Sequence, residues 1–375
     1  MIISPVEGES KKCLPTGTGE VCTELQDSAG AAARGATESA VQADEPSCSL
    51  EPGMWRHTRK TYCATHKGTY TEYDSSTPGK VLGTASFTTY QAATLSQTSG
   101  TWEETQKVTV GTTTGVVTSV DFSWTSMCSL GCTPTKPGPW TGSQNLRAGQ
   151  TATGTSKFTV TPSAGAYASV STSYALMALK PGSVPLNPEA NIGNPRKVRC
   201  DKMFANNTST GCVHADARPQ LVLPLSQYGA AAATYAWAQQ KLVDRWGSAS
   251  NPLRRLADSA AAEGNRTRVC GDGATRPFTH RPDLVVNDSC DEYPFAATHE
   301  GGRNGALCAD VIPLLENGVW QFYGDPAAPD VTGNEPCIRG HVPLEQNTAA
   351  GGKLGSNSQT ERIIPDEKFE VVITN

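Results

Sequence analysis

The chain has 375 residues, of which 37% are hydrophobic and 18% are charged, and its formal net charge is −5 at pH 7. This length allows two domains of ordinary size, and the low apolar fraction with 36 Gly and 25 Pro favours long loops and Thr/Ser-rich strands over helical bundles. No run approaches the ~18 apolar residues of a membrane span, and the acidic balance excludes a broadly cationic coat for nucleic acid. Any contact with DNA or RNA must therefore be local or mediated by a metal.

The twelve cysteines indicate disulfides. Their number is even and no CxxC pair occurs, so structural zinc is poorly supported. Scattered cysteines in a loop-rich chain are typical of an oxidising compartment. We therefore expect a secreted protein whose leader is removed or omitted, because MIISPVEGES has neither a basic nor an apolar signal region. Pairing between sequence neighbours is one of the many connectivities that the sequence leaves open: Cys13–Cys22, Cys48–Cys63, Cys128–Cys132, Cys200–Cys212, Cys270–Cys290 and Cys308–Cys337.

The first half of the chain predicts β structure. Residues 1–51 are small, polar and acidic, which predicts a mostly extended polar arm. Residues 52–180 are rich in β-branched and aromatic residues, often alternate apolar with polar side chains, and predict an antiparallel β-sandwich of about six to eight strands. Because no carboxylate pair, metal-ligand cluster or nucleophile stands there, we interpret this region as a non-catalytic β module for an unidentified surface ligand.

The second half differs in composition. Residues 181–199 contain four prolines and predict a linker, and residues 200–375 predict an α+β domain. Residues 226–247 have a helix-forming composition with Tyr235, Ala238 and Leu242 at helical spacing, and residues 368–374 predict a closing strand. Five histidines without acidic partners at ligand spacing are interpreted as surface or turn residues: His57, His66, His214, His280 and His341.

The most specific stretch is residues 288–302, DSCDEYPFAATHEGG. Four carboxylates and one imidazole lie within thirteen of these residues: Asp288, Asp291, Glu292, His299 and Glu300. Close carboxylates repel each other unless a cation lies between them or one takes up a proton. Hard oxygen ligands suit Mg²⁺, Mn²⁺ or Ca²⁺. The alternative is a solvated acidic loop beside a disulfide, with Tyr293 as a packing residue, and composition alone leaves both interpretations open.

The order of residues in this stretch resembles a known family. Cys-Asp-Glu-Tyr-Pro-Phe-Ala, followed by Glu-Gly-Gly, is similar to the signature of the bacterial secreted deoxyribonucleases called NucA/NucB. The resemblance covers roughly residues 196–375 and is weaker, segment by segment, outside the signature. The flanking segments that carry it are residues 199–201, 211–213, 233–239, 251–255, 347–359 and 365–373.

The resemblance implies hydrolysis of DNA phosphodiester bonds by a secreted, metal-dependent endonuclease using Mg²⁺ or Mn²⁺. Asp291 is the leading metal or catalytic carboxylate. Glu292 and Glu300 are the next ligand candidates, and His299 is a candidate general base or leaving-group acid. Candidate substrate contacts are the neutral side chains of an expected flexible glycine loop, together with two cations: Asn347, Asn357, Gln359, Arg303 and Lys353.

Two departures from the family pattern keep a second function open. The family often has a His in an Ala-x-His-Ile helix where this chain has Thr234, and His299 stands where close relatives can have another acid. The alternative function is therefore an extracellular binding or structural protein that carries a degenerate nuclease domain. Ribonuclease activity is a third interpretation.

Overall fold

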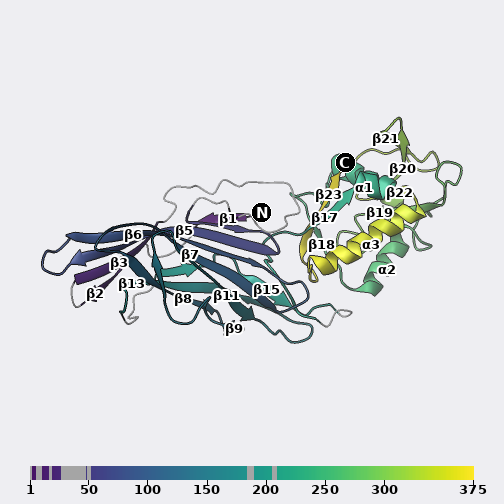
Figure 1. Ribbon diagram of the computed structural model, residues 1–375. Helices are drawn as coiled ribbons and strands as arrows, with labels where there is room; N and C mark the ends of the chain where they lie inside the picture. The colour runs from purple at the N-terminus through teal and green to yellow at the C-terminus, as the bar shows by residue number, and fades with distance from the viewer. Residues whose placement is uncertain are drawn as a thin grey trace. The chain divides into compact units, whose positions relative to one another are not determined.

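The computed structural model describes residues 2–5, 11–16, 19–26, 48, 52–183, 190–204 and 209–375. These residues are mostly β, with three α-helices and one short 3-10 helix (Figure 1). The contacts between Cα atoms divide the chain into two compact units, Met1–Ala217 and Arg218–Asn375. Each unit has its own large hydrophobic core.

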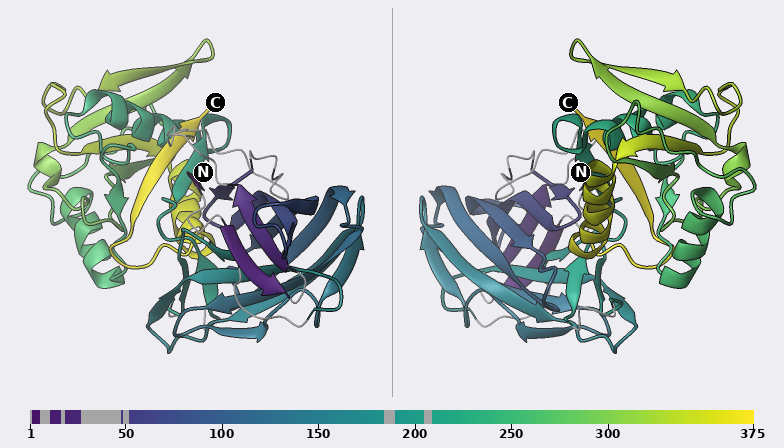
Figure 2. Two further views of the ribbon diagram at one scale, coloured as in Figure 1. Left: turned by 90° about the vertical axis from the view of Figure 1, so that its left-hand side faces the viewer. Right: turned by 90° about the vertical axis from the view of Figure 1, so that its right-hand side faces the viewer.

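The first unit is built on a nine-stranded sheet. Its main path runs β1-β4-β5-β6-β7-β11-β9, with β3 also paired to β5 and β2 to β3, and every pairing is antiparallel. Figure 2 shows that this sheet is strongly curved. The strands are β1 (Ile2–Pro5), β2 (Lys11–Thr16), β3 (Gly19–Gln26), β4 (Met54–His57), β5 (Thr61–Asp74), β6 (Val81–Thr94), β7 (Thr101–Gly115), β9 (Thr133–Lys136) and β11 (Thr151–Thr159).

Two smaller sheets complete the first unit. One has the order β10-β8-β13-β14, and the other has the order β12-β15-β16. In β8 buried Val120, Phe122 and Trp124 alternate with half-buried polar residues, which is the pattern of a strand with one face on the core. The strands are β8 (Ser119–Cys128), β10 (Gln144–Arg147), β12 (Tyr167–Val170), β13 (Thr172–Leu179), β14 (Ala190–Gly193), β15 (Val198–Asp201) and β16 (Gly211–Val213).

The core of the first unit contains an unusual polar network. Glu104 is fully buried and accepts hydrogen bonds from the hydroxyls of Tyr62 and Tyr174, each at 2.5 Å, and from Gln106 Nε2 at 2.9 Å. Burial nevertheless raises the pKa of Glu104 to about 7, although these hydrogen bonds act in the opposite direction. Sequence patterning did not reveal this network, since its residues occupy inward positions of strands that otherwise carry apolar side chains.

Several expectations for the first half need correction. The all-β prediction is confirmed, but the region between Met54 and Leu179 has ten strands rather than six to eight, and its main sheet curls. The expected N-terminal arm contributes strands β1, β2 and β3, although residues 27–47 lie outside the described part of the chain. The expected linker contributes β14 and the start of β15, because its Ala190 and Val198 belong to the core.

The second unit contains all three α-helices and two sheets. One sheet has the order β17-β23-β18 and the other the order β19-β22-β20-β21. Helix α1 packs against β17, β20, β22 and β23 as well as against α3. The elements are β17 (Gln220–Pro224), α1 (Leu225–Lys241), β18 (Leu253–Arg254), α2 (Ser259–Val269), β19 (Asp288–Tyr293), η1 (Gly305–Leu307), β20 (Ala309–Glu316), β21 (Val319–Gly324), β22 (Ile338–Pro343), α3 (Leu344–Thr360) and β23 (Lys368–Thr374).

Helix α1 and strand β23 confirm two sequence predictions, whereas α3 overturns one. The segment expected to be a flexible glycine loop is a 17-residue helix that begins directly after β22. Its glycines at 351, 352 and 355 have open space around them, so they lie on the outer side of the helix. They destabilise the helix only through the low helix propensity of glycine. Packing of Ala350 and Leu354 in the core of the unit outweighs that cost.

All twelve cysteines are paired between sequence neighbours, as in the connectivity proposed from the sequence. Cys270–Cys290 joins the end of α2 to β19. Among the described residues, no helix has both the length and the apolar character needed to cross a membrane.

Candidate functional site

The signature residues lie on a strand, so the alternation of side chains decides how they are grouped. Strand β19 pairs antiparallel with β22, and Asp291 stands opposite Gly340. The Asp291 side chain contacts Tyr235 of α1, whereas that of Glu292 lies near Arg266 of α2. The two neighbouring carboxylates therefore leave opposite faces of the sheet.

Asp291 is buried, with 4% of its surface exposed. The hydroxyl of Tyr235 donates to both of its carboxylate oxygens, at 2.8 and 3.0 Å. No Lys, Arg or His of the described residues forms an ion pair with it. Burial and the charge of Glu292 raise the pKa of Asp291 to about 8, and the hydrogen bond from Tyr235 offsets only part of this.

Helix α1 approaches this part of the sheet closely. A Cβ atom on Gly340 would lie 2.7 Å from Thr234 Oγ1, so the glycine makes room for the helix. Thr234 is fully buried and donates to Ala230 O at 2.8 Å. Thr234 is thus a packing residue of α1, and the following residue, Tyr235, makes the contact with Asp291.

Asn347 is the substrate-binding candidate that the fold brings towards Asp291. It lies in the first turn of α3, and its amide nitrogen donates to Ser289 Oγ at 3.1 Å and to Cys290 O at 3.0 Å. Ser289 and Asp291 are two residues apart on β19 and share a face. Within the described chain, the Asn347 carbonyl oxygen has no hydrogen-bond donor, so it is free to accept a ligand.

Glu300 is buried beside Arg254 rather than beside Asp291. One of its oxygens accepts from the Arg254 backbone N–H and the other from the Arg254 Nε, both at 2.8 Å. His299 is exposed, and its Nε2 lies 2.6 Å from Asp366 Oδ1. Among the described residues, no hydrogen bond or ion pair joins either residue to Asp291, so the compact carboxylate cluster expected from the sequence is not formed.

The other candidates are also separated. Asn357 lies ten residues beyond Asn347 on α3, roughly 15 Å along the helix axis, and is buried, whereas Gln359 is exposed and Lys353 half-buried. Arg303 is exposed on the loop before η1. Glu292 has its nearest cation at 3.9 Å, the Nε of Arg266, and burial raises the pKa of Glu292.

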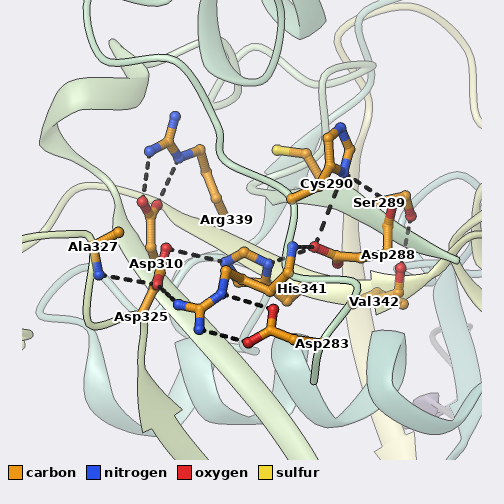
Figure 3. A network of polar contacts seen from close by, with 12 residues as sticks. Asp283, Asp288, Ser289, Cys290, Asp310, Asp325, Ala327, Arg339, His341 and Val342 are labelled. Carbon is orange, nitrogen blue, oxygen red and sulfur yellow. Dashed lines mark hydrogen bonds and ion pairs between the residues drawn. The ribbon is translucent and has the colours of Figure 1, made fainter. Parts of the chain in front are cut away.

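The face of the sheet that carries Glu292 holds a second polar network, which sequence analysis missed (Figure 3). His341 is fully buried between two carboxylates, with Nδ1 2.8 Å from Asp288 Oδ2 and Nε2 3.6 Å from Asp325 Oδ2. Arg339 pairs with both oxygens of Asp310, each at 2.6 Å. The interpretation of His341 as a surface or turn residue was therefore wrong, and so was that of His57, His66 and His214, which are buried in the first unit.

Only spatial pairing reveals the partners of these residues. His341 and Asp288 are 53 residues apart in sequence, so no local spacing could have indicated them. The available signal was the alternation of β22, where Arg339 and His341 are two residues apart and therefore share a face.

The donors around Asp291 can be tested against the metal that the resemblance implies. Asp291, Glu292 and Glu300 do not converge on one point. Among the described residues, one group of three metal-ligand side chains lies close together, namely Cys13, Glu20 and Cys22, and its two cysteines form a disulfide. The chain therefore lacks an all-protein cage in its described part. Mg²⁺ instead commonly uses one or two carboxylates with water and substrate phosphates, and Asp291 with the carbonyl oxygen of Asn347 fits that smaller set.

The second unit combines three helices with two sheets, and a comparison with known families covers its acidic strand β19. Residues 242–319, within the second unit, match the family model Deoxyribonuclease NucA/NucB, so this segment is similar to that family. The match contains Asp291, Glu292, His299, Glu300 and Arg303 but excludes α1 and α3. The family implies nuclease activity and is generally metal-dependent. No curated protein matches the chain.

Proposed function

We propose that the second unit hydrolyses phosphodiester bonds in DNA and that it requires a divalent cation, Mg²⁺ or Mn²⁺. The observation that carries this proposal is the environment of Asp291. A buried carboxylate with only a neutral phenol as its side-chain partner is costly to keep ionised, and a strongly raised pKa at such a position is typical of functional sites. The NucA/NucB match over β19 supports the assignment.

Asp291 and Asn347 are the proposed cation ligands. Both offer hard oxygen atoms, which Mg²⁺ and Mn²⁺ prefer. When bound, the cation neutralises phosphate charge, positions water and stabilises the developing oxyanion. The chain itself carries a net charge of −5, so a cation at this acidic position also resolves the repulsion between the protein and DNA.

The remaining site residues support this centre in different ways. Glu300 holds Arg254 on the side of β18, and Glu292 attracts Arg266 on the side of α2. His299 is the proposed proton-transfer group, and Asp366 orients its imidazole. Arg303 and Lys353 contact the DNA backbone as charges and the exposed Gln359 contacts it as a neutral group, whereas Asn357 is buried and is not retained as a DNA contact.

We also propose that the protein acts outside the cell. Six disulfides among twelve cysteines are consistent with an oxidising environment and would be unusual in a reducing one. The first unit is proposed to bind a surface ligand.

The test is a plasmid-nicking assay with the full chain. Supercoiled DNA is incubated with protein and Mg²⁺ or Mn²⁺, and parallel reactions contain EDTA. We expect conversion to the nicked and linear forms that EDTA abolishes. Persistent cleavage in EDTA contradicts the cation requirement, and an RNA substrate in the same assay decides between deoxyribonuclease and ribonuclease activity.

Absence of cleavage with every cation contradicts the proposed function. That outcome favours the second function considered from the sequence, an extracellular binding or structural protein with a degenerate nuclease domain. The separation of Glu300 and His299 from Asp291 favours that function, whereas the buried Thr234 leaves the contact between Tyr235 and Asp291 intact and gives no support to it.

A further inference from the structure

We propose that Tyr235 is the positioning residue for Asp291: its hydroxyl holds the carboxylate in the orientation that the reaction needs. This inference rests on the proposed function and assigns a role to a residue outside the segment that matches the family model. Tyr235 is not a catalytic residue in this proposal, because it acts only through Asp291.

The hydrogen bonds support this role first. One phenolic hydroxyl lies 2.8 Å from Asp291 Oδ2 and 3.0 Å from Oδ1, so it bridges the two oxygens. Both side chains are buried, with 1% of Tyr235 and 4% of Asp291 exposed. No other side chain in the described part of the molecule donates to Asp291. The rotation of this carboxylate is therefore restrained by a single donor.

The second support is the packing that holds the phenol itself. The Tyr235 ring stacks on Tyr293 with centroids 5.2 Å apart, and Phe295 meets it edge-on at 4.9 Å. Helix α1 is held close to β22 because Gly340 leaves room for Thr234. Tyr293 and Phe295 also contact each other, with ring centroids 5.0 Å apart, so the three rings form one packed group. Because this packing and burial restrict the Tyr235 ring, its hydroxyl is held in place before any substrate or cation arrives.

A fixed donor has a chemical consequence for the carboxylate. A hydrogen bond that bridges both oxygens occupies one side of the group and leaves its remaining lone pairs in a defined direction. Outer partners of this kind orient metal-binding side chains, and their removal typically costs about 10–100-fold in metal affinity or activity. We therefore expect Tyr235 to affect both cation binding and turnover.

Tyr293 provides a matched control. It is also a buried tyrosine, its ring belongs to the same aromatic group, and its hydroxyl donates to Trp246 O at 2.7 Å rather than to Asp291. Tyr235→Phe and Tyr293→Phe therefore each remove one buried hydroxyl and keep the ring. Only the first removes a contact with the carboxylate.

The experiment measures both variants in two ways. Isothermal titration of the folded protein with Mn²⁺, without DNA, gives cation affinity, and steady-state cleavage of a DNA oligonucleotide gives kcat and KM. For Tyr235→Phe we expect Mn²⁺ binding weaker by about 10-fold or more and kcat lower by about 10–100-fold, with KM for DNA within about threefold. Tyr293→Phe should keep both values near those of the wild type.

A double-mutant cycle tests the inference without relying on the Tyr235→Phe variant alone. If Tyr235 acts through Asp291, then Tyr235→Phe should lower residual cleavage and Mn²⁺ binding no further in an Asp291→Asn background. If Tyr235→Phe causes equal losses in the wild-type and Asp291→Asn backgrounds, the inference is overturned. It is also overturned if the wild type cleaves DNA and Tyr235→Phe retains the same Mn²⁺ affinity and kcat as Tyr293→Phe. Lack of cleavage by the wild type overturns the proposed function itself, and the inference falls with it.

Discussion

Asp291 and Glu292 are consecutive residues of β19 whose carboxylates lie on opposite faces of one sheet. Tyr235 contacts the first from α1, and Arg266 lies 3.9 Å from the second on α2. The separation follows from the alternation of side chains along an extended strand. The pair can therefore not act as two adjoining ligands of one ion, and the two positions should respond differently to mutation.

The first prediction compares neutral isosteres at these two positions. Asp291→Asn should reduce plasmid nicking by more than about 100-fold, because it removes the proposed anionic ligand. Glu292→Gln should reduce it by less than about 10-fold. Both thermal midpoints should stay close to the wild type, which calorimetry checks. Similar activity losses in the two variants would argue against separate roles for the two faces.

The second prediction concerns the ion pair between Arg254 and Glu300. Glu300 is 3% exposed and receives both of its described donors from Arg254. Arg254→Ala leaves the buried carboxylate with the backbone donor alone and should destabilise the protein by about 2–3 kcal/mol. Arg303→Ala, which removes the same charge from an exposed loop, should change the free energy of unfolding by less than about 0.5 kcal/mol. Urea denaturation measures both, and equal effects would refute the buried pair.

The third prediction is acid sensitivity of the first unit. Burial lowers the pKa of His57 to about 3 and those of His66 and His214 to about 4. A histidine with a depressed pKa in the folded state stabilises the fold fully above its unfolded value of 6.5. That stability is lost as the pH falls towards 4. Each residue contributes on the order of 3 kcal/mol over this interval.

Glu104 opposes this effect, since burial raises its pKa to about 7. Its protonated form stabilises the fold at low pH, and this contribution is lost as the pH rises from 4.5 to 7. Three histidines outweigh one carboxyl, so urea midpoints should fall between pH 6.5 and pH 4. His214→Gln should make that decline shallower, and Glu104→Gln should make it steeper. A flat profile contradicts the prediction.

The fourth prediction concerns the disulfide between Cys270 and Cys290, which closes a 20-residue separation and ends on β19 next to Asp291. Replacing both cysteines by alanine should cost about 3 kcal/mol in the free energy of unfolding and lower cleavage. The same change at Cys128 and Cys132, four residues apart in the first unit, should leave cleavage intact. Unfolding and nicking assays compare the two double-alanine variants. Full activity without the Cys270–Cys290 bond would contradict a role of this disulfide in holding β19.

Sequence patterning predicted the parts of the fold in which local signals are strong. Alternation predicted the β character of the first unit, and the small and aromatic residues around Tyr235 predicted α1. It failed for α3, where glycines suggested a loop although packing of Ala350 and Leu354 against the core supports a helix. It also failed for part of residues 181–199, where prolines suggested a linker although β14 and the start of β15 pair with β13 and β12.

The candidate site divides in the same way. Asp291 was selected from its motif, and the family match covers it. Tyr235, Asp288 and His341 were not selected, because their partners are 53 to 56 residues away. Their roles depend on which strand face meets which helix, and this depends on the pairing of β19 with β22.

The order of residues by itself therefore determined the oxidised cysteines, the β-rich first half and the acidic stretch that resembles a nuclease signature, since each depends on composition or on spacing along the chain. Tertiary structure alone decided that Asp291 is isolated in a buried setting with Tyr235, that Glu292 faces away, and that Glu300 belongs to Arg254. The physical reason is that a side chain's charge state and partners depend on burial and on contacts between segments distant in sequence, which no local pattern encodes.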